Sequence, residues 1–168
     1  MLVVCSLANV PKVVSDYQPS HVISLLGSNH EMPQIGSVAG PNHLKLGFND
    51  ISAPRDGFVP PGSRDVETLV RFARDWDRAS PMLIHCWAGI SRSTAGAFIT
   101  RCALNPAEDE MAIADELRAA SPPATPNRLM VSLADDLLGR GGRMRDAVTA
   151  IGRGAEAWEG NVFTLPAG

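Results

Sequence analysis

The chain has 168 residues, of which 45% are hydrophobic, enough for one sizeable hydrophobic core but too few residues for two typical domains. The formal net charge of −3 at pH 7 argues against a nucleic-acid-binding protein. Three cysteines do not make a disulfide framework, and no segment has the composition of a signal sequence or a membrane span, so we expect a cytoplasmic protein without a membrane partner.

The first half of the chain alternates strand-like and helix-like segments. Four apolar runs have the length of buried strands: residues 2–5, 21–26, 43–48 and 81–84. Helices are expected over residues 9–17 and from Ser63, as the cap, to about Ala79. The segments 28–42 and 51–62 have the composition of loops. This order predicts an α/β fold in which a mainly parallel sheet of about four strands carries helices on both faces.

The second half of the chain is expected to be helical. Its predicted helices span residues 93–104, 105–120, 125–139 and 143–153. The second of them has Asn105 as its cap and Pro106 at its first position. Together with the first half, these helices predict one domain over residues 1–154, followed by a loosely held tail over residues 155–168.

The apolar run 81–84 leads into a motif in which five residues separate a cysteine from an arginine: His85-Cys86-Trp87-Ala88-Gly89-Ile90-Ser91-Arg92-Ser93. Because a predicted helix follows, the motif lies at a strand-to-helix turn. Backbone N–H groups and the positive end of the helix dipole converge at such a turn and stabilise an oxyanion or a thiolate. We therefore expect Cys86 to be a nucleophilic thiolate at neutral pH. The turn is interpreted as a phosphate-binding loop. The residues expected to surround the phosphate are Trp87, Ala88, Gly89, Ile90, Ser91 and Arg92.

The other motif residues also have chemical roles. Arg92 offers a planar fork that can grip two oxygens of a phosphoryl group. Ser93 places a hydroxyl within reach of the sulfur, where it would ease the departure of the cysteine when an intermediate breaks down. Gly89 suits a sharp bend of the backbone around an anion. His85 is interpreted as a group that hydrogen-bonds to the loop backbone and helps to hold the thiolate, not as a general base.

The pattern His-Cys, five residues, Arg-Ser resembles the signature of the cysteine-dependent protein tyrosine phosphatases, and the short chain resembles their dual-specificity branch. In that family a Pro-Asn pair often opens a helix at the place of Pro126 and Asn127, which extends the resemblance beyond the motif. The resemblance implies a phosphatase fold and hydrolysis of a phosphomonoester through a phosphocysteine, with neither metal nor other cofactor. The implied substrate is a phosphorylated protein or a small phosphomonoester.

Expulsion of an alkoxide or phenoxide from phosphorus requires a proton, which a carboxyl group can donate. In the dual-specificity branch this acid is an aspartate at a strand end, some thirty-odd residues before the cysteine. Asp50 matches that position, because it follows the strand 43–48 and lies 36 residues before Cys86. Asp56, 30 residues before Cys86, is the alternative, but its Pro-Arg-Asp-Gly context equally describes a tight turn. We favour Asp50.

Other cysteines and histidines are expected to be structural. Cys5 ends a strand and could approach Cys86 to form a disulfide, although a small core residue is the favoured interpretation. Cys102 lies ten residues beyond Arg92 along one predicted helix and is too distant to take part. The remaining histidines, His21, His30 and His43, lack a spacing that would assemble a metal site.

Two other functions are compatible with parts of the motif. A rhodanese-type sulfurtransferase also uses a cysteine in a strand-to-helix loop, and an inactive relative of the phosphatases could bind phosphoproteins without hydrolysing them. Residues 87–91 carry no positive charge, which disfavours a polyphosphorylated inositol as the substrate. The sequence leaves open the choice between phosphotyrosine and phosphoserine or phosphothreonine, and also the oligomeric state.

Overall fold

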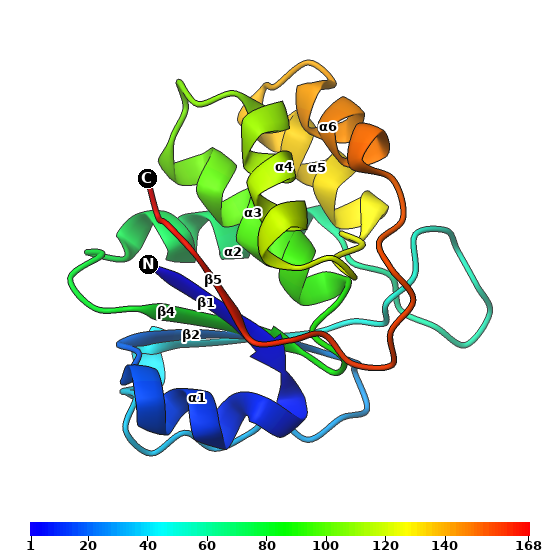
Figure 1. Ribbon diagram of the computed structural model, residues 1–168. Coiled ribbons are helices and arrows are strands. Elements are labelled where there is room, and N and C mark those ends of the chain that lie inside the picture. The colour runs from blue at the N-terminus through cyan, green and yellow to red at the C-terminus, as the bar shows by residue number, and fades with distance from the viewer.

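A five-stranded sheet forms the middle of the molecule, in the order β3-β2-β4-β1-β5 (Figure 1). The computed structural model describes residues 1–168, and the strands are β1 (Leu2–Ser6), β2 (His21–Leu26), β3 (His43–Gly47), β4 (Met82–Cys86) and β5 (Phe163–Leu165). The first four are mutually parallel, whereas β5 pairs antiparallel with β1. β1, β2 and β4 are buried almost throughout, which is why they are continuous apolar runs in the sequence.

Helices cover both faces of this sheet (Figure 1). One face carries a 3₁₀ turn (Leu7–Asn9) and α1 (Val10–Tyr17), which pack on a small core of eight buried residues. The other face carries five helices over a core of 32 buried residues: α2 (Ser63–Asp75), α3 (Arg92–Leu104), α4 (Glu110–Ala120), α5 (Arg128–Leu138) and α6 (Arg143–Ile151). A second 3₁₀ turn, Gly40–Asn42, precedes β3. The α/β class, the mainly parallel sheet and its two helical layers are thus confirmed.

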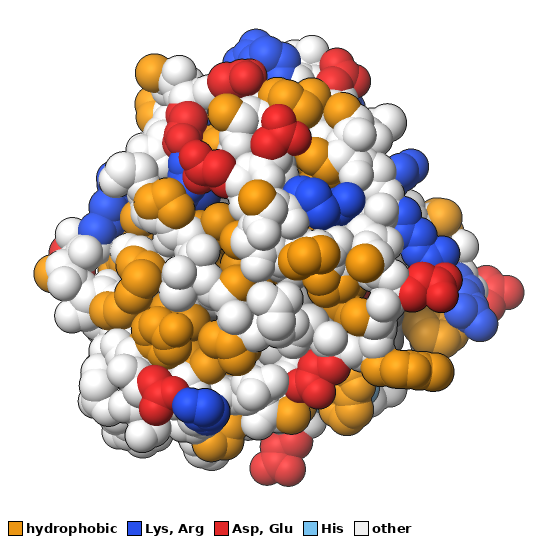
Figure 2. All heavy atoms as spheres, in the orientation of Figure 1, with side chains coloured by type: hydrophobic (Ala, Val, Ile, Leu, Met, Phe, Trp, Pro, Cys, Tyr) orange, Lys and Arg blue, Asp and Glu red, His pale blue; other side chains and the backbone are white.

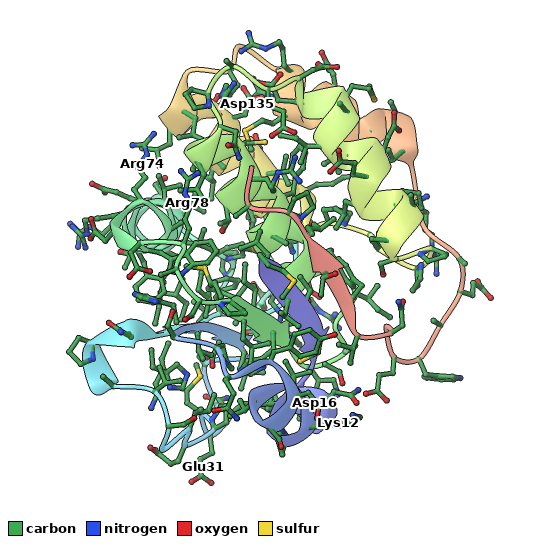
Figure 3. The ribbon with its side chains drawn as sticks, turned by 60° about the vertical axis from the view of Figure 1, so that its left-hand side comes forward. Lys12, Asp16, Glu31, Arg74, Arg78 and Asp135 are labelled. Atoms are coloured by element: carbon green, nitrogen blue, oxygen red, sulfur yellow. The ribbon has the colours of Figure 1, made fainter.

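The two helical layers differ in how polar groups are used (Figure 3). Lys12 and Asp16 form an ion pair on the solvent side of α1. Asp135, in the opposite layer, is fully buried, and its carboxylate accepts hydrogen bonds from the N–H groups of Gly142 (2.6 Å) and Met144 (2.8 Å). Those bonds tie α5 to the start of α6, and a buried Asp needs such partners to offset its desolvation. Within this layer, α5 and α6 are therefore held together by buried hydrogen bonds.

Two predicted helices have boundaries that differ from the observed ones. The helix predicted over residues 63–79 ends at Asp75, and Gly62 takes the N-cap position that we assigned to Ser63. The N–H of Gly62 donates to the Asp65 carboxylate (2.8 Å), so the acid supplies the capping bond. Trp76 leaves the helix but stays buried, with its indole N–H donating to the carbonyl of Ser80 (3.0 Å).

The helix predicted from Asn105 begins only at Glu110, after Asp109 as its N-cap. Asn105 has a different task, because its amide group donates to the carbonyl oxygens of Arg101 (3.0 Å) and Ala167 (2.9 Å). It thereby closes α3 and holds the C-terminal end of the chain. A cap residue followed by proline is a local pattern that serves either purpose.

The interpretation of residues 155–168 as a loosely held tail is also wrong. Residues Phe163–Leu165 form β5, which pairs with β1 and lies beside it in Figure 1. Phe163, Leu165 and Ala167 are buried in the larger core. The segment thus covers the edge of β1, which would otherwise expose a row of unpaired backbone groups. A strand of three residues is too short to produce a periodic signal in the sequence.

On the face drawn in Figure 2, Lys and Arg side chains are interspersed with acidic ones and form no basic area that extends across it. None of the helices has the length and apolar character that crossing a membrane requires.

Candidate active site

The motif forms a loop, residues 86–92, that joins the end of β4 to the start of α3. Cys86 is the last residue of β4 and Arg92 is the first of α3. Because β4 lies between β2 and β1 in the sheet, the loop leaves the carboxyl end of a central parallel strand. Open α/β sheets bind ligands at that edge. We refer to residues 86–92 as the Cys86 loop.

The backbone carbonyl groups of the Cys86 loop point away from its centre. Those of Trp87, Ala88, Ile90 and Ser91 accept hydrogen bonds of 2.8–3.3 Å from the backbone N–H groups of Leu7, Gly160, Thr125 and Asn127, respectively. The N–H groups of the same four loop residues donate to no protein acceptor. Together with the first turn of α3, they form a concave set of free donors, which is a nest for an anion.

Gly89 is required at the sharpest point of the loop. Its φ is +74°, and a Cβ there would lie 2.7 Å from the backbone nitrogen of Ser6 and 2.9 Å from the carbonyl carbon of Cys5. The loop therefore packs directly against the end of β1, and only glycine permits both the conformation and the close approach. The N–H of Gly89 points back to the Cys86 sulfur, at 3.3 Å.

Cys86 is 2% exposed and lies at the floor of the loop. Its Sγ is 3.2 Å from the Ser93 hydroxyl and accepts the N–H of Gly89. The Gly89 N–H, the free N–H groups of the loop and the N-terminal end of α3 all lie around this sulfur, so the loop presents positive partial charges to it. Ser93 therefore lies where its predicted role requires it.

Arg92 is almost fully buried, yet its guanidinium group faces the loop region. Its Nη1 donates to the carbonyl of Phe48 (2.9 Å), just beyond β3, and its Nε lies 3.9 Å from a carboxylate oxygen of Asp50. Nε itself has no hydrogen-bond partner. A buried guanidinium with a free donor is suited to bind another anionic group in addition to Asp50, such as a phosphoryl oxygen.

Asp50 lines a cleft that opens over the Cys86 loop, and Asp56 does not. One carboxylate oxygen of Asp50 accepts hydrogen bonds from the Ser91 hydroxyl (2.8 Å) and the Asn127 amide (2.8 Å). Asp56 lies in an exposed turn that is closed by the N–H of Phe58 and the carbonyl of Arg55 (3.1 Å). Of the two alternatives, only Asp50 lines the cleft and forms a hydrogen bond to the Cys86 loop.

Asn127 is a site residue that sequence reasoning assigned only to the start of a helix. Its side-chain oxygen caps α5 by accepting the N–H groups of Leu129 and Met130 (3.1 Å each), while its NH₂ group donates to Asp50. Its backbone N–H donates to Ser91 in the loop. One residue thus joins α5, the Cys86 loop and the candidate acid, and a capping pattern alone does not reveal the other two contacts.

The His85 side chain lies on the face of the sheet opposite to that of Cys86. It is fully buried, and its Nε2 lies 2.6 Å from the hydroxyl of Ser24, which in turn lies 2.8 Å from Nε2 of His43. Burial, with a smaller contribution from His43, lowers the pKa of His85 to about 4, and burial lowers that of His43 to about 4. Both rings are therefore neutral at pH 7, so His85 supplies no positive charge near Cys86.

Neither of the other cysteines can assist Cys86. Cys5 belongs to the small core under α1, whereas Cys86 belongs to the large core on the other face, so the two side chains point away from one another. Burial raises the pKa of both Cys5 and Cys102 to about 12, which keeps them as thiols. These placements support the interpretation of both as core residues.

A cleft of about 510 Å³ opens over the Cys86 loop. Its other walls come from Gly27 and His30 after β2, Asn49 and Asp50 after β3, and Ala157 and Trp158 near the C-terminus. The lining contains one arginine, Arg92, no lysine, and one acidic residue, Asp50, with the imidazole of His30 at its edge beyond β2. The cleft therefore suits one anionic group attached to an uncharged carrier.

No family model matches the chain, and no curated protein is similar to it in sequence. Solved structures do match. The match to human DUSP28 covers 89% of this chain and 94% of DUSP28, with a TM-score of 0.61 and 17% sequence identity. The match to Cydia pomonella PTP-2 phosphatase covers 80% of this chain and 84% of that protein, with a TM-score of 0.63 and 18% sequence identity. The match to PTPMT1 in complex with PI(5)P covers 89% of this chain and 93% of PTPMT1, with a TM-score of 0.62 and 12% sequence identity. At such identities the similarity establishes the fold, which is that of tyrosine and dual-specificity phosphatases, as the motif predicted.

Proposed function

We propose, from the phosphatase fold and the geometry of the Cys86 loop, that the protein is a phosphomonoester hydrolase that forms a phosphocysteine. One observation carries the proposal. The Cys86 sulfur lies in one cleft with a set of free backbone N–H groups and with a buried guanidinium that has an unpaired donor. This arrangement can hold the three non-bridging oxygens of a phosphoryl group over a nucleophile.

In the first step the Cys86 thiolate attacks phosphorus, an S–P bond forms, and the P–O bond to the leaving group breaks. The loop N–H groups and Arg92 stabilise the charge on the equatorial oxygens. Asp50, in its protonated form, gives its proton to the leaving oxygen, so that an alcohol or a phenol departs. Its hydrogen bonds to Ser91 and Asn127 hold the carboxyl group at the rim of the loop.

In the second step water attacks the phosphocysteine, and the S–P bond breaks to release inorganic phosphate. Asp50, now a carboxylate, can take a proton from the attacking water. The Ser93 hydroxyl, 3.2 Å from Sγ, donates to the sulfur as it regains negative charge. Neither step requires a metal, and none of the described residues form a cluster of three or more His, Cys, Asp or Glu side chains that could hold one.

The substrate class that we propose is a singly phosphorylated protein side chain. The lining of the cleft has one arginine, no lysine and one aspartate, so no second guanidinium or ammonium group is present to bind a further phosphate. Catalysis by a thiolate also requires a reduced Cys86, which favours a reducing compartment such as the cytoplasm.

The two alternatives have less support. A sulfurtransferase has no use for Asp50, Asn127 and Ser91 converging on the loop, and a non-hydrolysing module has no use for an intact nucleophile with Ser93 beside it. Sulfur transfer from thiosulfate without phosphatase activity would establish the first alternative. Phosphopeptide binding without turnover would establish the second.

The test is a hydrolysis screen with a chelator present, using an aryl phosphate, phosphotyrosine and phosphoserine peptides, inositol phosphates and nucleotides. We expect turnover of the aryl phosphate and of a phosphopeptide, and a phosphoryl adduct on Cys86 after rapid quenching. Chelator-sensitive activity, or turnover without an adduct on Cys86, would contradict the proposal. Preference for a polyphosphorylated inositol would contradict the charge argument.

A further inference from the structure

An apolar groove lies beside the catalytic cleft and shares a wall with it. Its volume is about 290 Å³, and it is lined by Leu7, Ala8, Trp87, Ala88, Trp158 and Glu159. Three of these residues, Trp87, Ala88 and Trp158, also line the cleft. The groove and the cleft are therefore neighbouring depressions, with Trp87, Ala88 and Trp158 as the wall between them.

Both tryptophans are exposed, although large aromatic side chains are usually buried. Trp87 is 58% exposed and Trp158 is 100% exposed. Two indoles next to a nucleophile form an apolar surface that the fold of this chain leaves uncovered. An uncovered apolar surface at a functional site is typical of a binding surface.

The backbone on the C-terminal side of Trp158 is held in place. The carboxylate of the next residue, Glu159, accepts hydrogen bonds from the amide of Asn9 (2.9 Å) and the hydroxyl of Ser6. The N–H of Gly160 donates to the Ala88 carbonyl (2.8 Å), and a Cβ on Gly160 would lie 2.6 Å from the carbonyl oxygen of Gly89. Trp158 thus projects from a segment that is anchored to the Cys86 loop and to the end of β1.

Because the groove adjoins the cleft, its expected occupant is a neighbouring part of the molecule whose phosphate is held at Cys86, one that reaches across Trp87 and Trp158. The volume is small for a whole ligand and suits one or two side chains. The only charged residue of the groove is the acidic Glu159, so no cation is present to attract an anionic membrane surface. These observations favour a peptide over a lipid.

We propose that the groove is a specificity subsite for an apolar side chain that lies within two residues of the phosphorylated residue in a protein substrate. This inference rests on the proposed function. It predicts that an apolar neighbour raises kcat/KM by about tenfold, which partial burial of one apolar side chain supplies.

The experiment compares phosphotyrosine peptides that carry either Leu or Ser one or two residues before or after the phosphotyrosine. For the wild-type protein we expect the Leu peptide to exceed its Ser counterpart by about tenfold in kcat/KM for at least one position. Ala8→Asp places a carboxylate in the groove, outside the catalytic cleft, and should bring this ratio close to one. Turnover of a small aryl phosphate should stay at the wild-type level.

Matched variants separate the subsite from a general disturbance. Ala107→Asp adds the same charge at an exposed position beyond the far end of α3, about 20 Å from the loop, and should keep the wild-type ratio. Trp158→Ala should lower the ratio, whereas Trp158→Phe should largely restore it. A ratio of one for the wild-type protein at every position, or equal ratios for Ala8→Asp and Ala107→Asp, would overturn the inference.

Two further arms identify other causes. Neutral vesicles that contain a phosphatidylinositol monophosphate should be poorer substrates than the Leu peptide; faster hydrolysis that Ala8→Asp abolishes would show that the groove takes lipid. Binding of the peptides to Cys86→Ser measures the preference without turnover. Failure to hydrolyse any phosphate with a retained binding preference would overturn the proposed function alone, whereas aryl phosphate turnover with no preference would overturn the subsite alone.

Discussion

His85 and Cys86 are adjacent in the sequence, and the two sides of β4 on which they lie have different chemistry. His85 faces the small core under α1, where its ring is neutral and contacts Ser24. Cys86 faces the large core and the floor of the cleft, where N–H groups and Arg92 favour negative charge. A strand places consecutive side chains on opposite faces. In the mechanism that we propose, Cys86 therefore performs the chemistry, whereas His85 helps to hold the strand that carries it.

The largest effect should follow from removal of the nucleophile. Cys86→Ser should abolish turnover, because an alcohol is a far poorer nucleophile than a thiolate at neutral pH. Substrate binding should be retained, since the loop N–H groups and Arg92 are unchanged. Turnover and phosphopeptide affinity are measured on the same preparation. A rate within about tenfold of wild type would exclude the covalent mechanism. It would also show that the chemistry does not lie on the Cys86 side of β4.

Arg92→Lys should be nearly as severe, on the order of 10³-fold in kcat/KM, although the charge is conserved. One ammonium cannot keep the bond to Phe48 and also present two donors to phosphate, and each donor lost from a developing charge costs about 10²–10³-fold. Steady-state kinetics with an aryl phosphate measure this effect. A near-normal rate would show that Arg92 does not bind the phosphoryl group.

Asp50→Asn should have an effect that depends on the leaving group. A phenol of low pKa departs without a proton, whereas an alcohol needs one, so the loss should grow toward about 10²–10⁴-fold for poor leaving groups. Asp56→Asn is the matched control and should show no such dependence on the leaving group. The reverse result would assign the acid to Asp56.

The smallest effect on turnover should come from His85. His85→Asn should change kcat/KM by less than about tenfold, because its contacts are with Ser24 and not with the reacting atoms. It should instead change how stability depends on pH. A loss as large as that of Cys86→Ser, with an unchanged fold, would place His85 in the chemistry and end the distinction between the two sides of β4.

The direction of that pH dependence follows from the lowered pKa values of His85 and His43, about 4 in the folded state against 6.5 for an ordinary histidine. The folded protein binds fewer protons than the unfolded chain between these values. The free energy of unfolding should therefore be fully retained above pH 6.5 and decline as the pH falls toward 4. Urea titrations across this range measure the slope, and His85→Asn should make it shallower. An unchanged slope would contradict the neutral, buried imidazole.

Local patterns were sufficient for the centre of the site. The apolar run before Cys86, the spacing of five residues and the helix after Arg92 are all encoded within about twenty consecutive residues, where backbone periodicity and turn chemistry operate. The same is true of β2 and, apart from its last residue, of β3. The motif was also sufficient to indicate the fold that the solved structures share.

Tertiary packing decided the rest. Asp50 and Asn127 are separated by 77 residues and meet only because the N-terminal end of α5 lies against the segment that follows β3. The contact of Gly160 with Ala88, the strand β5 and the exposed position of Trp158 depend in the same way on how the last residues return to β1. No pattern of neighbouring residues encodes such contacts, since they arise from burial of apolar surface between elements that are distant in the chain.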